Sequence, residues 1–187
     1  STSVAAFIVV VRDNVEMPPR ADAPGAKYTV APAGVPQLVT NWSEFTRKFG
    51  AAPTDAQGVT ETNVLARAVR GFFDNGGSRC WVARVASTAA PADKDPDLID
   101  ASLAAFAAID EISLVAAPLL SDDGVRVKAI QERLLAHCEK LGDRVAILDS
   151  PREITGDLTA SNILKLRNSD YGAYYFPWID VRGDGAY

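Results

Sequence analysis

The sequence predicts an α/β domain with a largely parallel sheet flanked by helices, arranged as a three-layer sandwich. Short, continuous apolar runs rich in β-branched residues recur along the chain, which is typical of strands buried on both faces. Segments with apolar residues at three- and four-residue steps separate these runs, which is typical of amphipathic helices. The alternation indicates strand–helix–strand units, whereas the order of the strands within the sheet does not follow from the sequence.

The first apolar run, Val4–Val11, is the predicted first strand. A proline-rich excursion follows over residues 12–36, with a short strand expected at 28–30. An excursion of this length in a compact domain is uncommon, so we expect it to lie on the surface and to contact something, or to be disordered.

A short extended piece at 37–40 leads into the first predicted helix. Asn41 is placed to cap this helix, and Glu44 three residues later completes a capping box. Gly50 ends the helix and Pro53 prevents its resumption, with a linker at 54–58. The apolar face of the helix, expected to enter the core, consists of Trp42, Phe45 and Phe49.

The stretch Leu65–Val85 organises the prediction. Its first part has one apolar helical face, two glycines then stop the helix, and a run suited to a strand begins at Cys80. A helix end and tight turn explain the glycines better than a phosphate loop does, because the glycines follow a helix and not a strand. The structural motif comprises Phe72, Phe73, Asn75, Gly76, Gly77 and Trp81, of which the aromatic residues are expected in the core.

The rest of the chain continues the alternation of helices and strands. Helix starts are expected at Asp95-Pro96 and at Ser121, where Asp122 and Asp123 favour the positive end of the helix. The predicted elements are a helix whose buried face holds Ile99, Leu103 and Phe106, a strand at Ile112–Ala116, a helix that Gly142 closes, a strand at Arg144–Leu148, a weaker helix at 157–167 and an aromatic, strand-like run at 171–179 that Pro177 interrupts.

Composition excludes several classes of function. The chain has 187 residues, enough for one domain, and its net charge of −5 argues against a nucleic-acid-binding surface. The longest apolar run is far shorter than the roughly 20 residues that a membrane-spanning helix needs. Two cysteines, Cys80 and Cys138, are too few for a disulfide framework, and two free buried thiols fit a reducing, cytoplasmic site of folding.

A search for chemistry finds one candidate carboxylate. The chain has no dinucleotide fingerprint, P-loop or nucleophile elbow, so we expect no catalytic residue and no cofactor. Asp149, at the end of a predicted strand, is the best candidate for an enzyme or metal site, although an aspartate before Ser-Pro commonly caps a turn. The single histidine, His137, lies beside Cys138 on a helix and is better explained as a half-exposed structural residue than as a metal ligand.

The aromatic run near the C-terminus has two explanations of equal weight. It is either a strand with aromatic packing on both faces or an interface patch, because tyrosine and tryptophan are enriched in interfaces. The candidate interface residues are Tyr174, Tyr175 and Trp178.

Six segments in order resemble the tail sheath proteins of contractile phages and related contractile injection systems. The most specific is the helix, Asn-Gly-Gly turn and strand over 68–85, and the resemblance covers nearly the whole chain. The other matching segments are Ser3–Ile8, Leu38–Phe45 with Phe49-Gly50, Ser113–Pro118, Arg144–Asp149 and Tyr174–Ile179.

This resemblance implies a structural, non-enzymatic role. Sheath subunits stack as rings of six around an inner tube, join through terminal arms that add strands to neighbouring sheets, and shorten to drive the tube outward. The implied partners are other sheath subunits, the inner tube protein and the baseplate, with neither nucleic acid nor an inserted membrane involved. The implied destination is a phage tail or injection particle.

Three departures from the family pattern are visible. The family implies an arm before Ser3 and a further domain and arm after Tyr187, and neither is present in residues 1–187. We therefore expect these residues to be a single sheath core domain and a fragment. The excursion at 12–36 is longer than the family pattern and is either a surface decoration or a contact to an adjacent ring.

Overall fold

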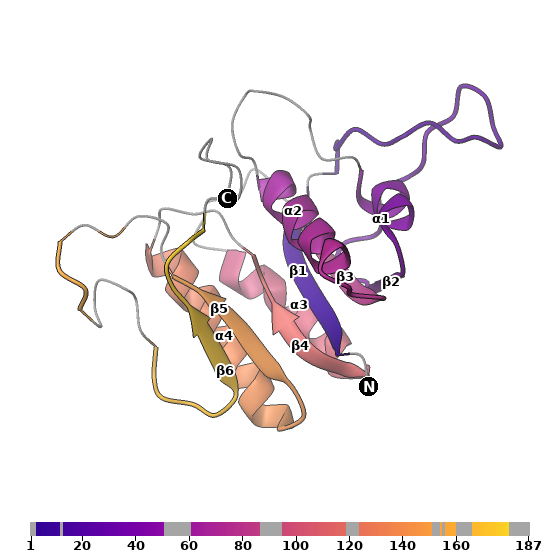
Figure 1. The fold of residues 1–187 in the computed structure, drawn as a ribbon. Helices are drawn as coiled ribbons and strands as arrows, with labels where there is room; N and C mark the ends of the chain where they lie inside the picture. The colour runs from indigo at the N-terminus through magenta and orange to yellow at the C-terminus, as the bar shows by residue number, and fades with distance from the viewer. Residues whose placement is uncertain are drawn as a thin grey trace.

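The computed structural model describes residues 3–11, 13–50, 61–86, 95–118, 124–150, 154, 156–159 and 166–179. The described strands form one six-stranded sheet in the order β2-β3-β1-β4-β5-β6, in which every neighbouring pair is parallel except β2 with β3 (Figure 1). This confirms the predicted α/β class with a largely parallel sheet between helices. The strands are β1 (Val4–Val11), β2 (Gln37–Val39), β3 (Cys80–Ala86), β4 (Ile112–Ala116), β5 (Val145–Asp149) and β6 (Gly172–Tyr175). The helices are α1 (Trp42–Phe49), α2 (Glu61–Asp74), α3 (Asp95–Phe106) and α4 (Gly124–Leu141).

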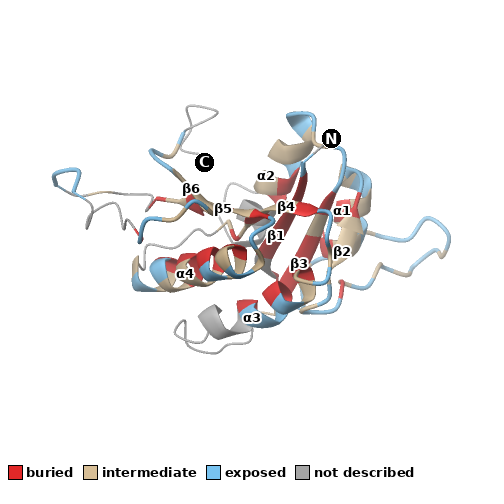
Figure 2. Ribbon diagram, turned by 90° about the horizontal axis from the view of Figure 1, so that it is seen from below, coloured by how far each residue is buried: buried red, intermediate tan, exposed pale blue. Residues whose placement is uncertain are grey.

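The central strand β1 has helices on both of its faces. Ala6 and Ile8 belong to a buried cluster with residues of α3 and α4, whereas Ala5 and Phe7 belong to a second cluster with residues of α1 and α2. Successive side chains of a strand point to opposite faces, so a strand between two helical layers is apolar at every position. The buried positions run through the middle of the molecule (Figure 2).

Strands β4 and β5 are buried on one face more than on the other. Their buried side chains, such as Val115 and Leu148, belong to the cluster beneath α3 and α4. The alternate side chains, including Leu114 and Ile147, are half-buried. The predicted burial of these strands therefore applies to one face, because α1 and α2 lie over the β1–β3–β2 half of the sheet (Figure 1).

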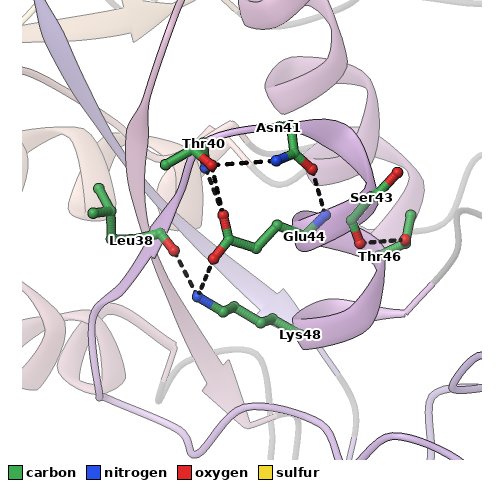
Figure 3. A network of polar contacts seen from close by, with 7 residues as sticks. All are labelled: Leu38, Thr40, Asn41, Ser43, Glu44, Thr46 and Lys48. Atoms are coloured by element: carbon green, nitrogen blue, oxygen red, sulfur yellow. Dashed lines mark hydrogen bonds and ion pairs between the residues drawn. The ribbon is translucent and has the colours of Figure 1, made fainter. Parts of the chain in front are cut away.

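The first helix begins with the cap that the sequence predicts. The Asn41 side chain accepts a hydrogen bond from the Glu44 backbone N–H at 2.9 Å. The Glu44 carboxylate, however, accepts from the backbone N–H and hydroxyl of Thr40, each at 2.9 Å, and not from the Asn41 N–H of a standard capping box (Figure 3). Lys48 donates to Glu44 at 3.0 Å and to the carbonyl of Leu38 at 2.6 Å, which draws the carboxylate toward β2. Gly50 ends the helix with a φ of 86°.

The strand expected at 28–30 is wrong. The excursion pairs with itself as a hairpin, in which the bridge joins Pro19 to Lys27 and the Tyr28 N–H donates to the carbonyl of Pro18. The sheet is not extended here because β3 already pairs with β2 on its outer side.

One prediction for the C-terminal third needs correction. The helix expected over 157–167 is not helical at its described residues 157–159 and 166–167. Arg167 instead pairs with Glu132 and Glu139, which ties this segment to α4. In the run over 171–179 the strand ends at Tyr175, as expected from the interruption at Pro177, which has no N–H for the sheet. The predictions for Pro53, the linker at 54–58 and the cap at Ser121 with Asp122 and Asp123 lie outside the described residues.

Candidate functional site

The carboxyl ends of the strands are where an open α/β sheet usually binds its ligands, particularly where the chain reverses direction across the sheet. Here that point lies between β1 and β4. The nearby guanidinium of Arg84 is buried and donates to the carbonyls of Ala31 and Val11, the latter at 2.9 Å. It also pairs with the Asp13 carboxylate at 2.7 Å. Arg84 therefore fastens the base of the excursion to the sheet, and the sequence contains no local signal for this role.

Asp149 ends β5, as the sequence predicts for a strand-end carboxylate. Burial raises the pKa of this carboxyl to about 6. Its backbone carbonyl accepts a hydrogen bond from the Gln131 amide of α4. A carboxyl whose pKa lies near neutrality is suited to proton transfer, but catalysis also needs a second reacting group and an orienting partner.

His137 and Cys138 do not supply that second group. The charges of Asp143 and Arg144 shift the pKa of His137, so His137 lies near these two residues at the amino end of β5. Asp149 lies at the carboxyl end of the same strand. The strand separates the two ends by about 13 Å at roughly 3.3 Å per residue. Burial first, and then the positive charge of Arg144, lower the His137 pKa to about 4, so the imidazole is neutral at pH 7.

The two cysteines are free, buried and distant in the fold. Cys80 belongs to the cluster beneath α1 and α2, and Cys138 to the cluster beneath α3 and α4. Burial raises the pKa of each thiol to about 12, so both are poor nucleophiles and poor metal ligands at pH 7. Within the described ranges, no three His, Cys, Asp or Glu side chains gather where they could hold a metal ion.

The glycine turn after α2 is closed by local hydrogen bonds and packs against Phe72 at Gly77. Gly76 has a φ of 92°, and the Gly77 N–H donates to the carbonyl of Phe72 at 2.8 Å. A Cβ on Gly77 would lie 2.3 Å from the nearest atom of the Phe72 ring. The Asn75 side chain donates to the carbonyl of Gly71 at 2.8 Å and closes the helix end. The local hydrogen bonds thus belong to a helix end, and the Gly76 and Gly77 N–H groups that a phosphate would need already donate to the carbonyls of Phe73 and Phe72.

The aromatic residues of this motif are half-buried. Phe72 and Phe73 pack against the cluster beneath α1 and α2, and Phe72 meets Phe7 edge to face at 5.9 Å. Trp81 packs against the opposite cluster and donates its indole N–H to Glu111 at 2.7 Å. Strand alternation explains why Trp81 and its neighbour Cys80 serve different layers.

The three candidate interface residues are separated by the structure. Tyr174 packs against the cluster beneath α3 and α4, and burial raises its pKa to about 12. Trp178 is part-buried and donates its indole N–H to the carbonyl of Ser150 at 2.7 Å. Tyr175 is 60% exposed, and the nearby Phe176 and Ile179 are 43% and 76% exposed. In this segment the exposed apolar surface therefore consists of Tyr175, Phe176 and Ile179, of which Ile179 lies outside the aromatic group that the sequence offers as an interface patch.

The two edges of the sheet differ in how open they are. Strand β2 is short, and the carbonyl of Leu38 already accepts from Lys48 (Figure 3). On its outer side, β6 has no partner strand among the described residues. A groove of about 240 Å³ runs beside β6 and α4 and is lined by Leu135, Leu148, Leu166, Arg167, Asn168, Ser169, Gly172 and Tyr174. An unpaired edge with an adjacent groove can accept an extended segment of another chain.

None of the described helices combines the length and apolarity needed to cross a bilayer. Among the described residues, the accessible features include the unpaired edge of β6 and exposed apolar side chains, which are suited to contact with another protein.

Comparison with known proteins supports the fold. No family model and no curated protein matches the sequence. A chain in the cryo-EM structure of the anti-feeding prophage (AFP) baseplate, 6-fold symmetrised, is similar in fold, with a TM-score of 0.51 and 24% sequence identity. The similarity covers 95% of this chain and 43% of that chain, so this chain spans less than half the length of its structural neighbour.

Proposed function

We propose that this chain is a structural subunit of a contractile tail sheath. In this role it assembles with other copies as stacked rings of six around an inner tube, and the assembly shortens to drive the tube outward. The observation that carries the proposal is the similarity of 95% of the chain to a chain of the anti-feeding prophage baseplate. The six sequence segments that resemble sheath proteins, in the same order, are a separate source of support.

The physical character of the domain suits this role. A contracting assembly needs rigid blocks that move about soft connections. The central strand β1 is packed between two helical layers, and buried polar groups such as Arg84 and Arg144 are tied to backbone carbonyls. Such a core resists deformation, so movement would be taken up between subunits.

The proposal also concerns domain organisation, partners and location. We infer that residues 1–187 form a core domain of a longer subunit, whose arms join neighbouring subunits by strand addition. The inferred partners are other sheath subunits, the inner tube protein and the baseplate. The inferred location is the bacterial cytoplasm during folding and a phage tail or injection particle afterwards.

Electron microscopy of the complete protein, produced together with the tube protein of its own system, tests the proposal. The expected result is a striated cylinder with six-fold symmetry around the tube. A protein that remains monomeric across salt and protein concentrations, with the tube present and the fold intact by circular dichroism, would contradict the sheath role.

A second candidate function is an α/β enzyme that uses Asp149 as an acid or base. The observation in its favour is the burial of that carboxyl, which raises its pKa to about 6. A screen of ligands and metal ions for thermal stabilisation tests it, with Asp149→Asn as the matched control. A stabilising ligand whose effect is lost in the variant would support the enzyme, whereas no stabilisation by any compound would count against it.

A further inference from the structure

One buried arginine holds both ends of the excursion against the sheet. We call residues 13–31 of the excursion the strap. From near the carboxyl end of β3, the Arg84 side chain donates to the carbonyl of Val11, where β1 ends, at 2.9 Å. It also donates to the carbonyl of Ala31, where the strap ends, and pairs at 2.7 Å with the Asp13 carboxylate, where the strap begins. The guanidinium therefore bridges the two ends of the strap and the end of a central strand.

The middle of the strap carries hydrogen bonds of its own. The Arg20 N–H donates to the carbonyl of Ala26 at 2.9 Å, and the Tyr28 N–H donates to the carbonyl of Pro18 at 3.0 Å. Every residue from 18 to 28 is half-buried or exposed, and this part of the chain is the violet loop that extends beyond α1 and β2 in Figure 1. These internal hydrogen bonds can persist when the strap leaves the domain, so they do not resist its opening.

The base of the strap packs on the domain beside α1. Met17 and Ala31 are buried, and the Ala31 N–H donates to the carbonyl of Lys48 at 2.8 Å. The half-buried Val15 packs against the cluster beneath α1 and α2, and a Cβ added to Gly50 would lie 3.0 Å from its Cγ2 atom. A segment that buries few apolar side chains opens at a lower free energy than the strands of a core do. The contacts at its base, including those of Arg84, therefore decide how often the strap opens.

We propose that the strap opens and closes as a unit while the sheet stays folded, and that the three contacts of Arg84 hold it closed. The planar fork of arginine suits this role, because its five N–H groups can serve two carbonyls and a carboxylate at once. Opening breaks the hydrogen bond to Ala31 and uncovers the apolar surface that Met17 covers in the closed strap. The inference does not depend on the sheath role, because it concerns the folded domain alone.

Native-state hydrogen exchange in the complete protein tests whether the strap opens separately. The Ala31 N–H, bonded to the carbonyl of Lys48, reports opening of the strap, and the Ala146 N–H, bonded to the carbonyl of Tyr171, reports unfolding of the sheet. After correction for intrinsic rates, Ala31 should exchange at least tenfold faster than Ala146. Urea below the unfolding transition should speed the exchange of Ala146 alone, because opening the strap exposes little surface. If urea speeds both amides equally, the strap opens only with the sheet and the proposal is wrong.

Two arginine variants test the part that Arg84 plays. Arg84→Met should speed the exchange of Ala31 about tenfold or more, since hydrogen bonds to a charged donor are lost. Arg144→Met is the matched control, because Arg144 is also a buried guanidinium that donates to backbone carbonyls, at the amino end of β5. It should speed the exchange of Ala146 and leave that of Ala31 unchanged, since opening of the strap does not require the sheet to unfold. Equal acceleration of both amides in Arg144→Met, or no effect of Arg84→Met on Ala31, would overturn the proposal.

Thiol labelling of Met17→Cys provides an independent measurement. The side chain at position 17 is covered while the strap is closed and becomes accessible when it opens. The native Cys80 and Cys138 are buried in the clusters on the two faces of the sheet, so their labelling reports unfolding of the domain. The label should enter at position 17 at least tenfold faster than at the native thiols, and faster again when Arg84→Met is added. Labelling of all three positions at one rate would contradict a separate opening of the strap.

Discussion

The close approach of Gly77 to Phe72 allows a sharp test of the packing after α2. In Gly77→Ala, the new Cβ would lie 2.3–2.5 Å from three atoms of the Phe72 ring, distances that real side chains do not adopt. The ring must therefore move away from Phe7 and Phe73, with which it makes edge contacts at 5.9 and 5.5 Å.

The cost follows from that displacement. Overpacking a well-packed site typically costs about 1–3 kcal/mol, and Phe72 is half-buried, so we expect a loss of about 2 kcal/mol in the free energy of unfolding. For a chain of this size, that loss lowers the melting temperature by about 4–8 °C. The larger Gly77→Val should unfold the domain or destabilise it further, whereas a ligand loop would lose binding and keep its fold.

Urea unfolding followed by circular dichroism measures the cost, and a double-mutant cycle assigns it. Gly77→Ala should cost little in a Phe72→Ala background, since the ring that it would strike is gone. Gly76→Ala is the matched control, because Gly76 has a φ of 92° and open space around it. Its cost of about 1 kcal/mol comes from the backbone and should be the same in both backgrounds. Equal costs of Gly77→Ala with and without Phe72 would refute the reasoning.

Three further predictions concern stability. Arg144→Met should destabilise the domain by about 3 kcal/mol in urea unfolding, because the fully buried guanidinium donates to the carbonyls of Phe106 and Ile109, which would lose their partner. Asp149→Asn should remove a pH dependence: the folded-state pKa of about 6 lies above the unfolded value near 4, so the contribution of Asp149 to stability is present below pH 4 and is lost as the pH rises through 6. At pH 7 the Asp149→Asn variant should be more stable than the unaltered protein. Melting temperatures that change with pH between 4 and 6 by the same amount in both proteins would contradict this. Asn41→Ala should cost about 1 kcal/mol through loss of the helix cap, and Asn41→Asp, which keeps an accepting oxygen, should restore most of it.

Several local features could be predicted from the sequence because their causes are local. The cap at Asn41, the helix ends at Gly50, Gly76 and Gly142, and the all-apolar β1 each depend on residues within a few positions of one another. The fold class followed from the alternation of these local patterns.

Local sequence patterns did not predict which residues near the C-terminus are exposed. Tyr174, Tyr175 and Trp178 are close in sequence, yet two of them pack inward and one is exposed, since strand alternation and the end of β6 direct them differently. Arg84 likewise has no sequence signal, because its partners Ala31 and Val11 are far from it along the chain.

The sequence by itself therefore determined most of the helices and strands, the cap at Asn41 and the apolar faces that pack them into layers. Tertiary structure alone decided the strand order, the position of His137 on α4 near Asp143 and Arg144 and away from Asp149, and the pairing of residues 18–28 as a hairpin outside the sheet. The physical reason is that helix and turn signals act over a few residues, whereas strand neighbours are chosen by crossovers that bring distant segments together.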